Sequence, residues 1–355
     1  MNNVCATMRM MECFAVLVLT TMLLAGCSSS ESPVTETWPV MGTFAAITVP
    51  ATEQYMLKES ASVARDTFST INNRFSLFVP ESDVSKINAS AGQFPVVIQP
   101  ETRPLLELCM HYAQITDGCF DPTISPLVKL WGFNGGQTLA KEPGPDTISR
   151  TKQLVEWRRM AISNMTAVLP VRDMKIDLGG IAKGYAVDEC YNKLKILGLT
   201  NAIINLGGNM KCMGRPSDKS PWKIGVQNPF HEENLVGILM LRDGLAVATS
   251  GNYERFVTIE GKRYAHIIDP RTGRPVSGMA GVTVVSRSAT EADVMSTALF
   301  VMGLKGAREV LSKVEFCEAL FILDEQPVTL WITPGLEKFF KPTKSFRNCI
   351  RILTP

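Results

Sequence analysis

The sequence predicts an α+β protein in which mixed or antiparallel sheets and packed helices form one compact unit. Helical spacing of apolar residues dominates the first part of the chain, whereas short strands and turns dominate residues 201–285. Helices followed by meandering strands are typical of the α+β class. Hydrophobic residues make up 45% of the 355 residues, which is enough to fill the core of one large or two small domains. No fixed-period repeat suggests a solenoid.

The first half of the chain alternates between helices and loops. Val40–Val49 alternates as a strand does, and Glu53–Phe75 places apolar side chains at helical spacing. Further along, we expect a loop at residues 76–88 with a short turn at Ser82-Asp83, a helix over Pro104–Thr116 ended by Asp117-Gly118, a Gly- and Pro-rich loop over Asn134–Asp146, and a third helix over Thr147–Met160.

The second half contains most of the expected strands. A helix is predicted to run to about Leu197, where Gly198 stops it. The segments NAIINLGGN, WKIGVQNP, LVGILML, LAVATSGNYERFVTI, RYAHIID and GVTVVS have strand character and are separated by turns. The patterns then predict helices over Ala289–Met302 and Lys305–Leu311.

The amino-terminal segment resembles a bacterial lipoprotein signal. Its apolar run, residues 13–24, is too short to span a bilayer but suits a signal-peptide core. The run leads into Leu24-Ala25-Gly26-Cys27 and a Ser-rich stretch, so Cys27 is the expected lipidation site. An ordinary secretory signal or a buried helix would also explain the run. The predicted organisation is a signal peptide (1–26), a lipidated Cys27 with a flexible tether (27–37), a single domain (38–345) and a C-terminal tail (346–355).

Charge and cysteine spacing exclude some functions. The formal net charge is +2 and no basic run stands out, which argues against a nucleic-acid partner. After processing at Cys27 six cysteines would remain, and none of them form a C-x-x-C pair. Neither a zinc site nor a thioredoxin-type motif is therefore predicted. The even number permits disulfides without establishing any.

The stretch KIDLGGIAKGYAVD, residues 175–188, predicts a strand, a two-glycine turn and a helix. Gly179 and Gly180 allow close approach of a ligand to the backbone, and the helix start offers unpaired N–H groups to an anion. Lys183 in the first helical turn opposes the helix dipole unless an anion is bound. The spacing matches neither dinucleotide-binding nor P-loop motifs, so a plain strand-to-helix connection with a solvated lysine stays open.

The segment SATEADVMSTAL allows two interpretations of Asp293. Asp293 and Thr297 are four residues apart on a predicted helix, so both oxygens face the same way. One carboxylate and one hydroxyl suit Mg²⁺ when phosphate and water complete the octahedron. Equally, Thr290 could be the N-cap residue with Asp293 as its partner in a capping box.

The stretch YAHIIDPRTGRPV predicts a hairpin with one notable side chain. Residues 269–273, DPRTG, give a strong β-turn signal between strands. His266 is one of only three histidines in the chain. A strand histidine is usually a packed or hydrogen-bonded residue, and a catalytic role is the other interpretation.

Taken together, these motifs resemble the ApbE family of FAD:protein FMN transferases, formerly described as thiamine-biosynthesis lipoproteins. The resemblance covers roughly residues 40–303 and is carried, in the family's order, by VMGT at Val40, FSLFVPESDVSKIN at Phe75, FDPT at Phe120, IDLGGIAKGYAVD at Ile176, NLGGN at Asn205, TSGNYERF at Thr249, HIIDPRTG at His266 and TEADVMSTAL at Thr290. The resemblance implies an ApbE-like α+β fold.

The resemblance also implies a set of site residues. The Mg²⁺ ligands would be the Gly180 carbonyl, Asp293 and Thr297. FAD would contact Met41, Phe78, Cys119, Phe120, Asp121, Asp177, Lys183, His266 and Ile267. Two positions depart from the usual pattern: Phe78 stands where many members have tyrosine, and Cys119 where many have alanine. Ring stacking survives the first change, although a hydroxyl contact does not.

The implied reaction transfers FMN from FAD to a Thr or Ser hydroxyl of another protein through a phosphodiester bond, with Mg²⁺ as cofactor and AMP as leaving group. Charge builds on phosphate oxygens during such a reaction, so a divalent cation and positioned donors suit it. His266 is the candidate base for the acceptor hydroxyl, and Asp293 or metal-bound hydroxide could replace it. Two other functions stay open: a Mg²⁺-dependent FAD pyrophosphatase giving FMN and AMP, and a non-catalytic FAD-binding lipoprotein.

By resemblance, the protein partners would be flavin-carrying subunits of respiratory or ion-pumping complexes. The lipid, including palmitate, would anchor the protein to the bacterial cell membrane on its periplasmic, extracytoplasmic face. Ser28 follows the cysteine and is not the Asp that favours inner-membrane retention in enteric bacteria. The choice between inner and outer membrane therefore stays open.

The lipoprotein signal makes the first testable prediction. The variant Cys27→Ser should lose acylation and leave unprocessed or freely soluble protein, because the modified thiol is gone. Metabolic labelling with a radioactive fatty acid and membrane fractionation measure both outcomes. Unchanged membrane retention of the variant would contradict the prediction.

Overall fold

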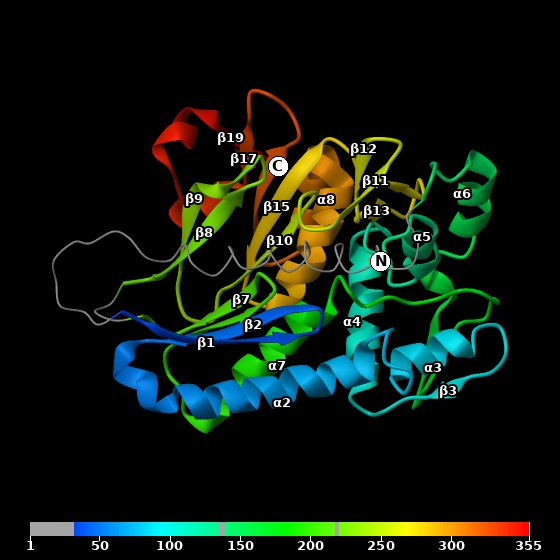
Figure 1. Ribbon diagram of the computed structural model, residues 1–355, viewed down its shortest axis with the longest axis horizontal. Helices are drawn as coiled ribbons and strands as arrows, with labels where there is room; N and C mark the ends of the chain where they lie inside the picture. The colour runs from blue at the N-terminus through cyan, green and yellow to red at the C-terminus, as the bar shows by residue number, and fades with distance from the viewer. Residues whose placement is uncertain (1–31, 135–138, 217–219, 355) are drawn as a thin grey trace, which may run out of the picture. The chain divides into compact units, whose positions relative to one another are not determined.

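A nine-stranded sheet is the centre of the fold (Figure 1). The computed structural model describes residues 32–354 except 135–138 and 217–219, so the signal segment and Cys27 lie outside the described residues. All neighbouring strands pair antiparallel except the last pair, β17 and β19, which is parallel. In spatial order the strands are β1 (Val34–Val40), β2 (Thr43–Val49), β6 (Ala202–Leu206), β7 (Asn209–Met213), β10 (Ala246–Gly251), β15 (Met279–Ser286), β16 (Cys317–Leu323), β17 (Leu330–Ile332) and β19 (Ile350–Ile352).

Both edges of this sheet differ from the prediction. The predicted strand Val40–Val49 is half of a hairpin, because β1 precedes β2 and pairs with it along its whole length. β1 therefore begins inside the predicted tether, and β19 lies inside the predicted tail. The sequence VTETWPV gives a weak strand signal, because several of its side chains are polar and exposed. The strand is stabilised by its pairing with β2 and by the stacking of Trp38 on Phe68. The structured unit is accordingly longer than residues 38–345 at both ends.

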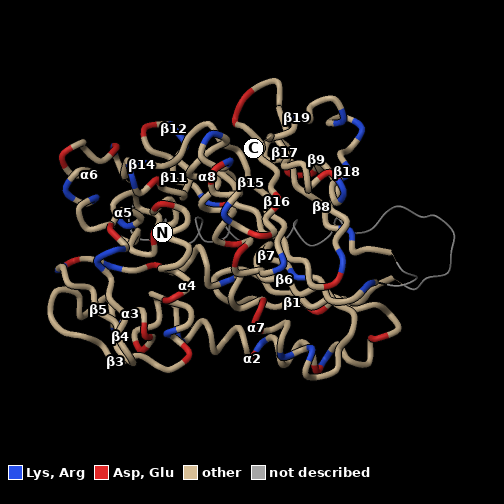
Figure 2. The backbone as a smooth tube through the Cα atoms, turned by 180° about the vertical axis from the view of Figure 1, so that it is seen from behind, with Lys and Arg blue, Asp and Glu red and all other residues tan. Residues whose placement is uncertain are grey.

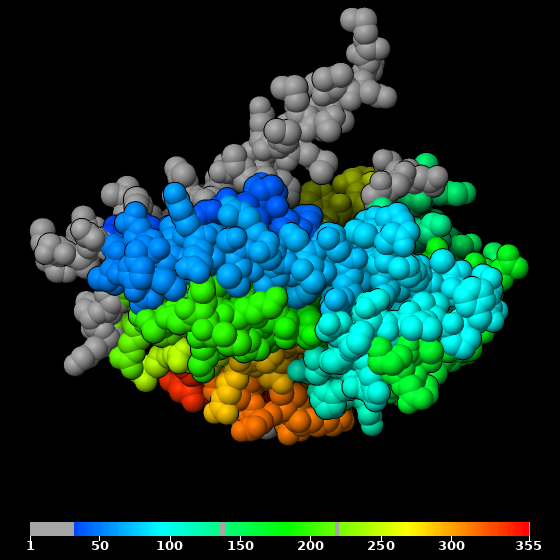
Figure 3. All heavy atoms as spheres, turned by 90° about the horizontal axis from the view of Figure 1, so that it is seen from below, coloured from blue at the N-terminus to red at the C-terminus, as the bar shows by residue number. Residues whose placement is uncertain are grey.

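Three long helices pack against one face of the sheet. They are α2 (Leu57–Phe75), α7 (Ala182–Leu197) and α8 (Ala289–Leu311). α2 runs beside α7, with α2 in blue and α7 in green in Figure 3. α7 ends as predicted at Gly198, whose φ of 92° is the left-handed conformation that glycine adopts without a side-chain clash. The two predicted helices after residue 289 form α8, which is broken at Gly303 (φ 63°).

The second face of the sheet is covered by strands. β8 (Trp222–Asn228), β9 (His231–Leu241) and β18 (Phe340–Pro342) form a three-stranded sheet whose apolar side chains share a core with the central sheet. Every residue of β15 is buried, because β15 has α8 on one face and this second core on the other. The predicted α+β class with mixed and antiparallel sheets is confirmed.

The remaining elements are mostly short. They are the 3₁₀ helix η1 (Ala51–Met56), α3 (Asp83–Ala89), β3 (Val96–Val97), α4 (Thr102–Ile115), α5 (Ser125–Leu130), α6 (Pro145–Lys152), η2 (Trp157–Arg159), β4 (Ala161–Ser163), β5 (Thr166–Val168), β11 (Phe256–Ile259), β12 (Lys262–Ala265), β13 (Ile268–Asp269), β14 (Arg274–Pro275), η3 (Pro334–Lys338) and η4 (Lys344–Cys349). The DPRTG turn joins β13 and β14 as predicted.

Two predicted local structures in this part were wrong. The expected loop over 76–88 contains α3, because Ser82 caps it by accepting the N–H of Ser85 at 2.9 Å. The helix expected over Thr147–Met160 ends at Lys152, and only the 3₁₀ turn η2 follows before residue 160. The turn at residues 153–156 lets Trp157 pack into the interior beside the buried Asp121.

Lys and Arg are interspersed with Asp and Glu along the backbone trace (Figure 2). The six cysteines within the described residues are unpaired thiols, so the disulfides that the sequence permitted are absent there. Among the described helices, none has the length and apolar character needed to cross a membrane.

Candidate functional site

The two-glycine turn before α7 is closed by its own side chains. Asp177 Oδ1 accepts the N–H of Gly179 at 2.8 Å, which is the local bond typical of an Asx turn. Lys183, in the first turn of α7, donates from Nζ to the Gly179 carbonyl at 3.1 Å. Burial raises the pKa of Asp177, while its bond to Gly179 and the charge of Lys183 act in the opposite direction. The turn is thus stabilised without any ligand, and it presents a lysine at a helix N-terminus.

The start of α8 decides between the two interpretations of Asp293. The N-cap residue is Ser288, whose Oγ accepts the N–H of Glu291 at 3.2 Å. Thr290 therefore lies inside the first turn, and Asp293 lies in the second turn, too far along to cap its own helix. The capping-box hypothesis for Thr290 and Asp293 was wrong, because helix formation begins one to two residues earlier than it requires.

Asp293 instead contacts the first turn of α7. Its Oδ2 accepts the N–H of Gly184 at 2.9 Å, and its Oδ1 lies 3.7 Å from Lys183 Nζ. A β-carbon at position 184 would lie 2.2 Å from the Ala289 carbonyl oxygen and 2.7 Å from Asp293 Cβ, so only glycine permits this approach. Burial raises the pKa of Asp293, and Lys183 and the Gly184 N–H oppose that rise. The carboxylate is buried yet compensated.

The other two predicted metal ligands lie at the same place. A β-carbon at Gly180 would lie 3.6 Å from Thr297 Oγ1 and 3.4 Å from the ring of Phe120, which brings these three residues together. Thr297 Oγ1 lies 3.3 Å from Ser250 Oγ and 3.4 Å from the Asp293 carbonyl. The structure therefore unites Gly180, Asp293 and Thr297 at the junction of α7 and α8.

The donor set fits a hard divalent cation. It offers one carboxylate, one hydroxyl and one backbone carbonyl, all oxygen, as Mg²⁺ prefers. Within the described residues no hydrogen bond reaches the Gly180 carbonyl. Asn209, which also bonds to Asp293, has a buried Oδ1 without a partner there. No group of three or more His, Cys, Asp or Glu side chains suited to a metal occurs in the described residues, so any cation here relies on neutral oxygens as well.

The structure shows the local surroundings of the other predicted residues. Met41 has φ 52° at the tip of the β1–β2 hairpin, a conformation uncommon for a residue with a side chain. Phe78 is 70% exposed between α2 and α3, so its ring is open to a partner. Cys119, Phe120 and Asp121 are buried. The Asp121 carboxylate is occupied by Thr123 and the Trp157 N–H, so any ligand contact of that segment involves its backbone or Phe120.

His266 and Ile267 follow β12 and face the same region. Nδ1 of His266 lies 3.1 Å from the Arg255 carbonyl, while the Ile267 carbonyl accepts the N–H of Val276 at 2.9 Å. Burial lowers the pKa of His266 to about 4, and the charges of Arg255 and Lys183 lower it as well. His266 is therefore a neutral imidazole near pH 7.

Sequence reasoning did not assign roles to two neighbours. The Arg255 guanidinium also lowers the pKa of Asp177, and its Nη2 approaches the Met41-Gly42 turn. Neighbouring atoms that displace water from the Glu254 carboxyl group raise its pKa, and the charge of Asp293 adds to this, although the residue as a whole is exposed. Both residues belong to the TSGNYERF motif, and membership of that motif was the one sequence feature that could have identified them as site residues. Nothing in the spacing of that motif indicated that its charges turn back toward α7.

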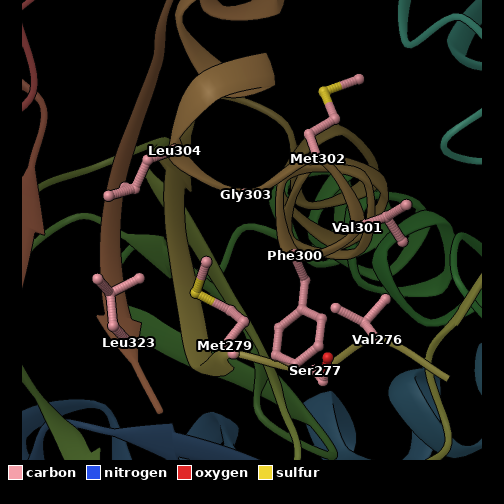
Figure 4. Close-up of a pocket in the computed structure, with 10 residues that line it drawn as sticks. Val276, Ser277, Met279, Phe300, Val301, Met302, Gly303, Leu304 and Leu323 are labelled. Atoms are coloured by element: carbon pink, nitrogen blue, oxygen red, sulfur yellow. The ribbon is translucent and has the colours of Figure 1, made fainter. Parts of the chain in front are cut away.

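An apolar cavity of about 340 Å³ lies further along α8 (Figure 4). Phe300 and Val301 line it one turn beyond Thr297, and Leu304 lines it after the break at Gly303. Val276 and Met279 face it from the segment that follows the β13–β14 hairpin. Its walls suit apolar groups and not phosphate.

The fold and the junction define an α+β protein in which two helix N-termini, a lysine and neutral oxygens form a site suited to an anion and a hard cation. Residues 41–321 match the model of the ApbE family. The chain belongs to the ApbE family.

Relatives and solved structures extend this result. An FAD:protein FMN transferase of Klebsiella pneumoniae is 33% identical over 258 residues, covering 70% of this chain and 78% of the relative. Another from Vibrio cholerae is 28% identical over 297 residues, covering 82% and 88%. The solved flavin transferase ApbE from Vibrio cholerae has a TM-score of 0.78 at 27% identity, covering 87% of this chain and 99% of that one. The ApbE protein from Thermotoga maritima has a TM-score of 0.76 at 30% identity, covering 90% and 100%.

The neutral state of His266 gives a prediction for pH. Because its pKa of about 4 lies below the ordinary 6.5, the unfolded chain takes up this proton first as pH falls, and stability is lost between those values. We expect the His266 ring resonances to keep neutral shifts down to pH 5 in NMR spectra, with His266→Gln used for assignment. The melting temperature of His266→Gln should fall less on acidification than that of the parent. An imidazole that titrates near 6.5 would contradict this.

Proposed function

We propose that this chain transfers FMN from FAD to a Thr or Ser hydroxyl of an acceptor flavoprotein, forming a phosphodiester bond and releasing AMP. The observation that carries the proposal is the junction of the α7 and α8 N-termini, which unites Lys183, Asp293, Thr297 and Gly180. Membership of a family whose relatives bear the name FAD:protein FMN transferase supports the flavin chemistry.

The pyrophosphate of FAD would lie at the start of α7. The positive end of the helix dipole attracts its negative charge. Lys183 adds a full positive charge at the same end of the helix. Phe120 lies beside Gly180, and the exposed ring of Phe78 is suited to stacking on a flavin or adenine ring.

The cation would be Mg²⁺, held by Asp293, Thr297 and the Gly180 carbonyl. When bound there, Mg²⁺ supplies charge neutralisation to the pyrophosphate oxygens. The Gly184 N–H fixes Oδ2 of Asp293, so Oδ1 remains for a second partner beside Lys183.

The residues also supply a path for the proton. The acceptor oxygen forms a bond to the FMN phosphorus, and the bond from that phosphorus to the oxygen of the AMP phosphate breaks. Since Nδ1 of His266 faces the Arg255 carbonyl, a proton on Nδ1 leaves Nε2 free to accept the hydroxyl proton. Lys183 and the helix N-terminus stabilise the charge on the departing AMP.

The same site could serve two other outcomes. Water in place of the acceptor hydroxyl would give a FAD pyrophosphatase that releases FMN and AMP, and no turnover would leave a FAD-binding lipoprotein. The buried Asp293 beside Lys183 favours chemistry over storage, because storage needs no cation site at the pyrophosphate. A mixture of the purified protein, FAD, Mg²⁺ and a candidate acceptor separates all three. We expect flavin fluorescence on the denatured acceptor band, whereas free FMN alone would indicate the pyrophosphatase and intact FAD the binding protein.

The lipidation and location remain part of the proposal. The signal-like segment ending at Cys27 supports a lipid anchor on the periplasmic face of the bacterial cell membrane. This location suits acceptors among flavin-carrying subunits of respiratory or ion-pumping complexes.

The variant Asp293→Asn tests the cation site. Asn can keep the bond to the Gly184 N–H through its oxygen but lacks the negative charge that Mg²⁺ favours. We expect a folded protein with nearly parental melting temperature and no measurable FMN transfer. Asp83→Asn is a matched control, since Asp83 is buried and accepts the Gln99 N–H at 2.8 Å away from the site. Transfer by Asp293→Asn in proportion to its folded fraction would contradict the assignment.

The variant Lys183→Met tests the anion site. A charge-assisted contact contributes roughly 1.5–3 kcal/mol, so FAD affinity should fall by about one to two powers of ten. Unlike a solvated first-turn lysine, Lys183 compensates Asp293, so the free protein should also melt somewhat lower. Fluorescence titration with FAD and thermal unfolding measure these effects, with Lys193→Met on the exposed side of α7 as the control. Parental FAD affinity would show that the helix N-terminus binds the phosphates alone.

A further inference from the structure

Asp188 lies on α7 but binds the beginning of α8. Its Oδ1 accepts the N–H of Ala289 at 3.0 Å, and its Oδ2 accepts the N–H of Thr290 at 2.9 Å. The hydroxyl groups of Ser288 and Thr290 donate to Oδ2 at 2.7 and 2.8 Å. The N–H groups of Ala289 and Thr290 are among the first four of α8, which have no acceptor within their own helix. A carboxylate from a neighbouring helix therefore caps α8.

The contact runs in the opposite direction as well, because Asp293 of α8 caps α7. Gly184 is the third residue of α7, so its N–H is one of the first four that have no acceptor within the helix. It donates to Asp293 instead. The same bond orients the proposed cation ligand, and no hydrogen bond from the described residues reaches the Gly180 carbonyl.

Lys211 holds Asp188 in its place. Its Nζ lies 2.7 Å from Asp188 Oδ1 and donates to the Arg287 carbonyl at 3.0 Å, just before α8 begins. Burial raises the pKa of Asp188, but Lys211 and the hydrogen bonds outweigh this, so the net pKa lies below its usual range. An ionised carboxylate in a fixed orientation can act as a rigid link between the two helices.

We propose that Asp188 is a positioning residue for the cation site: by fixing the first turn of α8 against α7, it sets Asp293 on the Gly184 N–H. This inference rests on the proposed function of the site. Asp188 itself touches neither ligand, and its effect passes through Asp293 and Thr297 on the helix that it caps.

The test compares two variants that differ only in the cap. Lys211→Met removes the charge partner but keeps the cap. Asp188→Asn/Lys211→Met weakens the cap and leaves no unpaired buried cation. For both, amide exchange at Gly184 and in the middle of α7 is measured in the metal-free protein. Mn²⁺ binding in the presence of FAD is measured by EPR, and FAD binding in EDTA by fluorescence.

If Asp188 positions the site, the Gly184 amide of the double variant should exchange its hydrogen about tenfold faster than in Lys211→Met. The affinity for Mn²⁺ should fall by about tenfold in the same comparison, as expected for loss of one cap. Amides in the middle of α7, and FAD affinity in EDTA, should be unchanged. Equal Gly184 exchange and equal Mn²⁺ affinity in the two variants would overturn the inference. A uniform loss of protection against hydrogen exchange along α7, accompanied by a loss of FAD affinity, would also overturn it, because that is the result expected of a purely structural role.

A further variant covers the case in which the double variant does not fold. Asp188→Glu keeps the charge beside Lys211 but moves the carboxylate by one methylene group, and it should show the same selective loss at Gly184. A protein that binds no Mn²⁺ at all in its parental form would refute the proposed function. The exchange at Gly184 would still decide whether Asp188 positions Asp293.

Discussion

The rest of the site depends on one interaction, in which a carboxylate of α7 caps the start of α8 and a carboxylate of α8 caps the start of α7. A helix start leaves N–H groups without internal partners, and here each helix satisfies part of the other's need through Asp188 and Asp293. The buried carboxylate of Asp293 and the half-buried one of Asp188 would be costly alone, but Lys183 and Lys211 compensate them. The arrangement forces both positive helix ends to one place, and that place is where an anion and a cation can be bound together.

The close approach of the helices depends on Gly184, since any β-carbon there would collide with the Ala289 carbonyl. The sheet determines what surrounds the junction. β10 and β15 lie under α8, so Ser250 at the end of β10 reaches Thr297. The β1–β2 hairpin contributes the Met41 turn, whose unusual backbone conformation is the kind of local strain found at functional sites. Loops from distant parts of the sequence thus meet at two helix N-termini.

Lys183 shows how context changes the meaning of a residue. A lysine in the first turn of a helix is unfavourable by itself, because it faces the positive end of the dipole. Here it contacts the Gly179 carbonyl and a buried carboxylate, so its charge is balanced in the free protein. Its exposed fraction of 29% leaves it accessible to an incoming phosphate. The same side chain can therefore stabilise the fold and attract the substrate.

The sequence by itself determined the class of the fold, the C-terminal end of α7, the break near Gly303 and the order of the family's motifs. Local patterns carry these features, since helix periodicity, a C-terminal glycine and turn residues act over a few positions. Tertiary structure alone decided that β1 and β19 are strands, because their short segments gain stability only by pairing within the sheet. It also decided that Asp293 caps α7 and not its own helix, and that Asp188 caps α8. Those bonds join residues about a hundred positions apart, and spacing within a motif contains no information about a partner at that distance.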